Sequence, residues 1–180
     1  MSKEISELTL KSSPVSTDEI EIQETGGGSS RRTTLQGVIN AFITHGTFTP
    51  TVQDTSKSDA EGQTYGNQVG VYTKIDDVVY FSITISVASK GTLTAGNQAF
   101  IANLPFTSRN STELYGGVLG VSGQGFSISQ YSNVTGEIAP NTDFIGMALW
   151  DSTSGVSALL VSEIATGSNI VINGMYFTDE

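Results

Sequence analysis

The sequence has no cysteine, only one histidine and few basic residues. Without cysteine, neither disulfides nor thiolate chemistry can operate. Lys and Arg number 8 against 18 Asp and Glu, so the net charge is −10. Only Arg31 and Arg32 are adjacent, so the clustered basic face that binds nucleic acid phosphates is missing. An acidic surface would also be repelled by anionic lipid.

Long apolar runs are also missing. No stretch approaches the roughly 18 apolar residues of a membrane helix. The opening residues MSKEISELTL lack the apolar core of a signal peptide. We therefore expect a soluble protein that is made in a cytoplasm and does not insert into membranes.

The usual signatures of catalysis are scarce. A Ser-His-Asp triad or a histidine metal site would have to use His45, which we interpret as a linker residue. The segment GVSGQ at 120–124 lacks the closing glycine of GxSxG, and GQG at 123–125 fails the dinucleotide fingerprint. We expect a protein that is not an enzyme and holds no cofactor.

One acidic segment is a candidate metal site. Asp54, Asp59 and Glu61 fall within nine residues, but their spacing does not match an EF-hand loop. A solvated loop is the simpler interpretation, and a weak surface calcium site near Asp54–Glu61 is the alternative.

The residues that are abundant indicate an all-β protein. Charged residues make up 14% of the chain, against about 25% in an average domain, and Gly, Ser, Thr and Asn replace them. Short apolar segments separated by turn residues recur from Gly46 onward and predict a β-sandwich or jelly roll over residues 46–180. The predicted strands are 47–53, 65–75, 78–88, 98–102, 116–122, 126–131, 143–151, 157–163 and 168–178.

Residues 1–45 have a different pattern. The segment 18–24 alternates acidic residues with Ile, a glycine-rich loop follows, and 31–34 can return as a second strand. Leu35, Val38, Ile39 and Phe42 then recur at helical spacing, with Thr34 as N-cap. This predicts a small hairpin-plus-helix module with little core of its own.

Several strands are apolar on both faces. In 78–88 the odd positions form a core face, yet Val78 and Tyr80 lie on the other face. A two-residue turn at Asp76-Asp77 would place Ile75 opposite Val78, Thr73 opposite Tyr80, Tyr72 opposite Phe81 and Gly70 opposite Ile83. The segments 144–150 and 170–177, the latter including Met175 and Phe177, are also apolar on both faces. Contact with another subunit would cover such strands, and shielding by a loop is the alternative.

Four short motifs recur in a known arrangement: GTFTPT (46–51), QVGVYTKI (68–75), VYF (79–81) and LPFTS (104–108). They resemble the elements GTWTPTL, QVGRYTKIGN and LPF of a module found in bacteriophage tail-fibre and other virion appendage proteins. Phe48 in place of Trp, Val71 in place of Arg and the Asp-Asp turn are departures. ISEL (5–8), DEI (18–20) and RRTTL (31–35) resemble a segment near the start of many phage fibre and capsid-associated proteins.

The resemblance implies a virion protein, assembled in the host cytoplasm, that docks to other virion proteins through residues 1–45. Such proteins are usually homotrimers, so Ile75, Val78, Tyr80, Met175 and Phe177 become the expected subunit interface. For Ile75, Val78 and Tyr80, contact with the N-terminal module is the alternative. The expected docking residues are Ile20, Ile22, Arg31, Arg32 and Leu35.

The leading hypothesis is a short tail fibre or receptor-binding fibre whose β-sandwich head contacts a host surface polysaccharide or protein. A capsid head fibre or decoration protein is the first alternative, and a carbohydrate-binding module is the second. Trp150, Tyr115 and Tyr131 are the aromatic residues nearest to turn-rich segments, where sugar rings could stack, although core or interface roles are simpler for each.

Overall fold

A computed structural model describes residues 13–22, 31–56, 60–112, 116–128, 133–151 and 155–180. The chain divides into two compact units, Met1–Ile43 and Thr44–Glu180. Among the described residues, no helix combines the length and apolar character needed to span a membrane.

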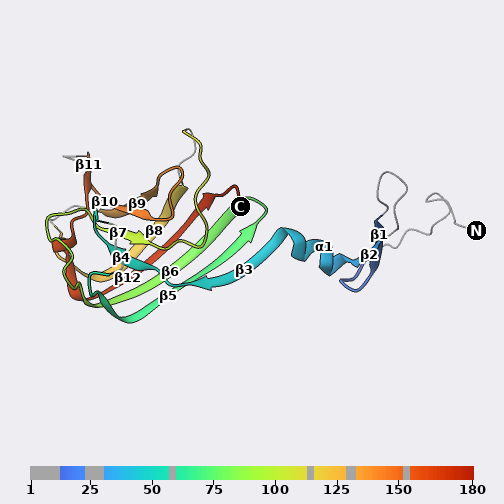
Figure 1. The fold of residues 1–180 in the computed structure, drawn as a ribbon, viewed down its shortest axis with the longest axis horizontal. Coiled ribbons are helices and arrows are strands. Elements are labelled where there is room, and N and C mark those ends of the chain that lie inside the picture. Colours follow the sequence, from blue (N-terminus) through green and yellow to red (C-terminus); the bar gives the residue numbers. More distant parts are fainter. Residues whose placement is uncertain (1–12, 23–30, 57–59, 113–115, 129–132, 152–154) are drawn as a thin grey trace, which may run out of the picture. The chain divides into compact units, whose positions relative to one another are not determined.

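The N-terminal unit contains a short hairpin and one helix (Figure 1). Strand β1 (Glu19–Ile22) pairs antiparallel with β2 (Arg31–Thr34). Helix α1 (Leu35–Phe42) follows directly, and the Thr34 hydroxyl accepts a 3.0 Å hydrogen bond from the Gly37 N–H as its N-cap. The predicted hairpin, helix and N-cap are confirmed.

The C-terminal unit is built from one continuous sheet that folds into two layers (Figure 1). Its strands follow the order β3-β5-β6-β12-β8-β9-β10-β7-β4, and β11 pairs with β10. The strands are β3 (Ile43–Phe48), β4 (Thr51–Gln53), β5 (Thr64–Ile75), β6 (Val78–Ser89), β7 (Phe100–Ala102), β8 (Gly116–Phe126), β9 (Asn133–Ile138), β10 (Ile145–Asp151), β11 (Gly155–Ala158) and β12 (Ile164–Phe177). A 3-10 turn, η2 (Val161–Glu163), precedes β12. The predicted all-β, sandwich-like fold is confirmed.

The β5–β6 hairpin has the register expected from the sequence. Ile75 lies opposite Val78, and Tyr72 lies opposite Phe81. Asp76 takes the positive φ of 55° that the tight turn requires. The odd residues of β6 from Val79 to Val87 are buried, so they line the core between the two layers.

Aromatic rings on the inner face lie over glycines of neighbouring strands. A side chain at Gly46 would meet the Tyr72 ring at 2.6 Å, and one at Gly70 would overlap the Phe48 ring. Tyr72 of β5 therefore covers Gly46 of β3, and Phe48 of β3 covers Gly70 of β5. Gly174 leaves the same kind of space for Phe81, which it faces directly in the sheet.

The Leu104-Pro105-Phe106 segment is anchored by the fully buried Tyr176. The Tyr176 hydroxyl accepts a hydrogen bond from the Phe106 N–H (3.2 Å) and donates one to the Phe106 carbonyl (3.0 Å). Leu104 is buried, and the Phe106 ring meets Tyr72 edge-on with centroids 5.2 Å apart. Burial raises the pKa of the Tyr176 hydroxyl, so it stays protonated as a donor at neutral pH.

Side chains of β5 and the preceding loop close the seam along edge strand β4. The Val52 N–H donates to the Tyr65 hydroxyl (2.8 Å), and the Val52 carbonyl accepts from Gln63 Nε2 (3.0 Å). Gln68 Nε2 donates to the Pro50 carbonyl (3.0 Å). Pro50 lies between β3 and β4, so consecutive residues connect the two ends of the strand order.

Some predicted strands differ from the structure. The predicted strand 47–53 is two strands, because Pro50 cannot donate to a ladder and separates β3 from β4. The predicted strand 157–163 ends at Ala158, and η2 occupies its second half. Strand β9 was not predicted, since Gly136 on its inward side conceals the alternation. Of the predicted strand 126–131, Phe126 closes β8, Ser127 and Ile128 lie outside strands, and 129–131 are outside the described residues.

Replacing Gly174 by alanine should destabilise the fold by about 1–3 kcal/mol. The new methyl group would overlap the Phe81 ring and lie 2.7 Å from the Gly117 carbonyl oxygen. Gly120→Ala, in the paired strand with open space around its Cβ, should change stability by less than about 0.5 kcal/mol. Urea unfolding at one protein concentration measures both, and equal midpoints for the two variants would contradict the packing described here.

Candidate functional site

The outer face of β5, β6 and β12 carries no charged residue. The strand registers place on this face the residues that alternate with the buried core positions. They are Asn67, Val69, Val71, Thr73 and Ile75 of β5, Val78, Tyr80, Ser82, Thr84 and Ser86 of β6, and Asn169, Val171, Asn173, Met175 and Phe177 of β12. We call this set the uncharged face. A solvated sheet face normally carries polar and charged side chains.

The five residues expected at a subunit interface come together on the uncharged face. Ile75 pairs with Val78, and Tyr80 and Val78 pair with Met175 and Phe177 of β12. Tyr80 and Ile75 are each 44% exposed, while the other three are half-buried. The structure thus places these side chains in one patch, and the subunit contact itself stays a prediction.

The sequence reasoning missed Val69 and Val71, which are 39% and 48% exposed on the same face. The sequence already contained a pattern that predicts them, because Val69-Gly70-Val71-Tyr72 is apolar on both faces of β5. Exposed valines beside the predicted patch extend the uncharged face along β5.

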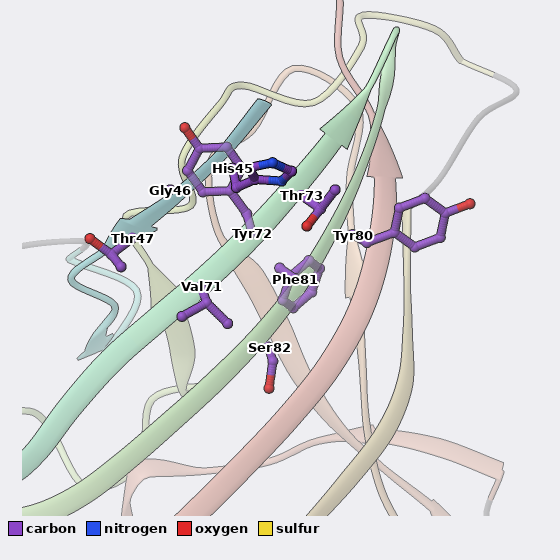
Figure 2. A pocket seen from close by; sticks show the side chains of 9 residues that line it. All are labelled: His45, Gly46, Thr47, Val71, Tyr72, Thr73, Tyr80, Phe81 and Ser82. Carbon is purple, nitrogen blue, oxygen red and sulfur yellow. The ribbon is translucent and has the colours of Figure 1, made fainter. Parts of the chain in front are cut away.

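A shallow hollow of about 580 Å³ lies at the β3 side of this face (Figure 2). Figure 2 shows His45, Gly46 and Thr47 from β3, Val71, Tyr72 and Thr73 from β5, and Tyr80, Phe81 and Ser82 from β6 around it. His45 is exposed within β3, so it belongs to a strand and the linker interpretation is wrong. The hollow is bordered by β-branched and aromatic side chains together with small hydroxyl groups.

Arg109 closes one end of the uncharged face. Its guanidinium bonds Asp77 (2.7 Å) and Asp179 (2.6 Å) and lies over the Phe177 ring, 5.6 Å from the centroid. The hydrogen bond from Arg109 lowers the pKa of the Asp77 carboxyl below its usual range. The hairpin turn and the C-terminal residues are therefore held together beside Phe177.

Asp54 serves as an anchor for loops at the edge of β4. Its buried carboxylate accepts hydrogen bonds from the Ser56 N–H (2.7 Å), the Thr94 N–H (2.9 Å) and Asn97 Nδ2 (3.0 Å). Burial alone would raise the pKa of this carboxyl, but the hydrogen bonds from Ser56, Thr94 and Asn97 outweigh it and lower the pKa well below its usual range. Among the described side chains, no three His, Cys, Asp or Glu residues gather as a metal site would require, and Asp59 lies outside them.

The remaining candidate residues lie on both units. In the N-terminal unit, Ile20 is exposed, Arg32 forms an exposed 3.4 Å ion pair with Glu19, and Leu35 begins α1. Ile22 and Arg31 lie in β1 and β2. In the C-terminal unit Trp150 is 48% exposed on β10, and Tyr115 and Tyr131 lie outside the described residues.

No family model matches the chain, and no curated protein sequence matches it. A solved structure with a similar fold is the crystal structure of the Dettilon tailspike protein, with a TM-score of 0.59 and 18% sequence identity. The match covers 75% of this chain and 24% of the tailspike chain, so this chain corresponds to about a quarter of the tailspike's length. At this identity the similarity establishes a shared fold.

Asp54→Asn should destabilise the protein by about 1–3 kcal/mol at pH 7, because an amide cannot replace the charged acceptor of three hydrogen bonds. Since the folded pKa of Asp54 is depressed, its stabilisation is present above the unfolded pKa of about 3.9 and is lost as pH falls below it. Unfolding free energies measured between pH 7 and pH 2 should therefore fall less steeply in the variant than in the wild type. Asp143→Asn, at an exposed position, is the stability control at pH 7, and equal losses in the two variants would contradict the anchor role.

Proposed function

We propose that this chain is a structural protein of a bacteriophage virion, a short tail fibre or receptor-binding fibre that acts as a homotrimer. In this proposal residues 1–45 dock to other virion proteins, and the β-sandwich forms a head that contacts the host surface. The sequence motifs resemble those of phage appendage proteins, and the fold is similar to part of a tailspike. The observation that carries the proposal is the uncharged face.

The uncharged face is suited to contact with a second copy of the same chain. Each copy has a net charge of −10, so two copies would repel one another wherever their acidic surfaces met. A face without charge avoids that repulsion, and depletion of charged residues is typical of interface cores. Exposed Val71, Ile75 and Tyr80 supply apolar area that burial would stabilise.

The N-terminal unit supports a docking role through its uncovered apolar side chains. Within α1, Ile39 is 46% exposed and Phe42 is 58% exposed, and no residue of the helix is buried. A short helix of this kind gains its stability from packing against something else. Another virion protein would provide that surface.

We place the chain among proteins that bind their target without cleaving it. Two carboxylates with lowered pKa values, Asp54 and Asp77, already hold loops and turns in place. Groups tied to such structural bonds are poorly placed to exchange protons with a substrate. A host surface polysaccharide or protein would therefore be retained intact.

The trimer predicts a mass of about 57 kDa in solution, three times the 18.9 kDa of one chain. Val71→Lys should dissociate it, because three lysines would be buried in a face that offers no carboxylate. Val156→Lys, the same change at a 71% exposed valine outside the uncharged face, should leave the mass unchanged. Light scattering at micromolar concentration measures all three proteins, and a monomeric wild type or an unaffected Val71→Lys variant would contradict the proposal.

Attachment assays test the docking and receptor roles together. The whole protein should be retained by host cells and taken up by virions that lack it, whereas a chain beginning at Thr44 should bind cells but not virions. Incubation with host envelope polysaccharide should release no new reducing ends.

Each outcome has a clear consequence. Uptake by purified capsids without retention by cells would favour a capsid head fibre or decoration protein. Unfolding of the shortened chain would show that the N-terminal residues belong to the core. Release of reducing ends that stops on mutation of a carboxylate pair would overturn the non-enzymatic role.

A further inference from the structure

A groove of about 360 Å³ lies on the outer face of the layer that contains β9, β10 and β11, away from the core. Its floor consists of Gly146 and Ala148 of β10 and Ala158 of β11. Ala148 pairs with Ala158, and Gly146 pairs with Glu137 of β9, so small residues of adjacent strands lie together. The larger side chains around them make the hollow.

Polar side chains of β9 and of the segment before β7 line this groove. Glu137 and Thr135 alternate with inward residues along β9, so both lie on the groove side. Within the described parts of the chain, neither side chain makes a hydrogen bond or an ion pair. Gln98 Nε2 donates to the Met147 carbonyl (3.0 Å), which fixes the amide at the rim of the groove.

An exposed aromatic platform lies in the next row of the same face. On the outer side of β10, Trp150 is the next residue after Ala148. It pairs with Val156 of β11, and Val156 lines the groove. Trp150 is 48% exposed and Val156 is 71% exposed. An indole this exposed offers apolar area that a ligand or partner could cover.

We propose that this groove binds a neutral pyranose unit of a host surface glycan, with one sugar face stacked on Trp150 and its hydroxyls bonded to Glu137, Thr135 and Gln98. The inference deepens the proposed receptor-binding function and rests on it. It assigns the binding site to the β9–β10–β11 layer, which is distinct from the uncharged face.

The lining selects the chemical class of the ligand. Small-molecule sites combine apolar surface with a few placed polar groups, and this groove has both in a volume near the lower end of their usual range. Among the described residues that line the groove, Glu137 alone is charged, so an anionic sugar would meet repulsion here and from the net charge of −10. A carboxylate, a hydroxyl and an amide match the donors and acceptors of sugar hydroxyls.

Trp150 provides a direct reporter, because it is the only tryptophan in the chain. The methyl glycosides of glucose, galactose and N-acetylglucosamine should be titrated into the whole protein while tryptophan emission is recorded. At least one should change the emission saturably, and free glucuronate should not. Calorimetry gives the dissociation constant independently of the fluorophore.

Ala148→Leu, which fills the floor of the groove, should weaken binding by at least about tenfold, and Glu137→Gln should weaken it several-fold. Ala95→Leu is the matched control, because Ala95 is exposed outside the groove and its variant should bind as the wild type does. Circular dichroism and solution mass confirm that each variant keeps its fold and assembly. Glu137→Gln changes no volume and keeps the test valid if the leucine variant fails to fold.

Failure of the groove can be told apart from failure of the receptor function. If none of the neutral glycosides changes the emission while the protein still binds host cells, the groove inference is wrong and receptor binding stands. Equal sugar binding by Ala148→Leu and the wild type would also overturn the groove inference. A third contrary result is that Ala148→Leu loses cell attachment although the wild type binds no sugar. The groove would then bind a protein of the host surface. Saturable sugar binding without any cell attachment would support the groove and contradict the proposed receptor role.

Discussion

Aromatic rings over glycines set the geometry of the inner face, and the packing of the C-terminal unit depends on this fit. Phe48 and Tyr72 each occupy the space that a glycine of the other strand leaves open, which fixes β3 against β5. Phe81 does the same over Gly174 in β12. The residues that carry the resemblance to phage appendage proteins include Gly46, Phe48, Gly70 and Tyr72, so that motif describes a packing unit. Phe48 replaces a tryptophan of the pattern and still covers its glycine.

Because aromatic rings and glycines fill the inner face in this way, the two outer faces of the sandwich can differ in character. The β5–β6–β12 layer presents side chains without charge, while the β9–β10–β11 layer presents an acid, a hydroxyl and an open indole around a floor of small residues. In the proposed function, self-contact and ligand contact use separate layers, and this would let several ligand sites act together in one assembly. Linked sites of this kind gain apparent affinity without any new contact.

Local signals in the sequence were sufficient for the elements that local chemistry decides. The Asp76-Asp77 turn fixed the register of the β5–β6 hairpin, and Thr34 marked the start of α1. Strand β9 was missed because a glycine took an inward position, where an apolar residue would have shown the alternation. The predicted patch around Tyr80 followed from the two-faced patterns of the 75–80 hairpin and of residues 170–177, which pair side by side in the sheet. The groove could not be predicted, because Glu137, Gly146 and Ala158 meet only through pairings between three strands, and sequence alone does not reveal such pairings.

The hydrogen bonds along β4 have a consequence for how copies of this chain behave when they are crowded. An open strand edge is a template on which another chain can add, and repeated addition leads to fibrils. Here the Val52 N–H and carbonyl are already occupied by Tyr65 and Gln63, so this edge offers an incoming strand little to pair with. Growth by strand addition is thereby discouraged at β4, while association through sheet faces remains open. Even at high concentration, polymerisation along this edge would first require these side-chain hydrogen bonds to break.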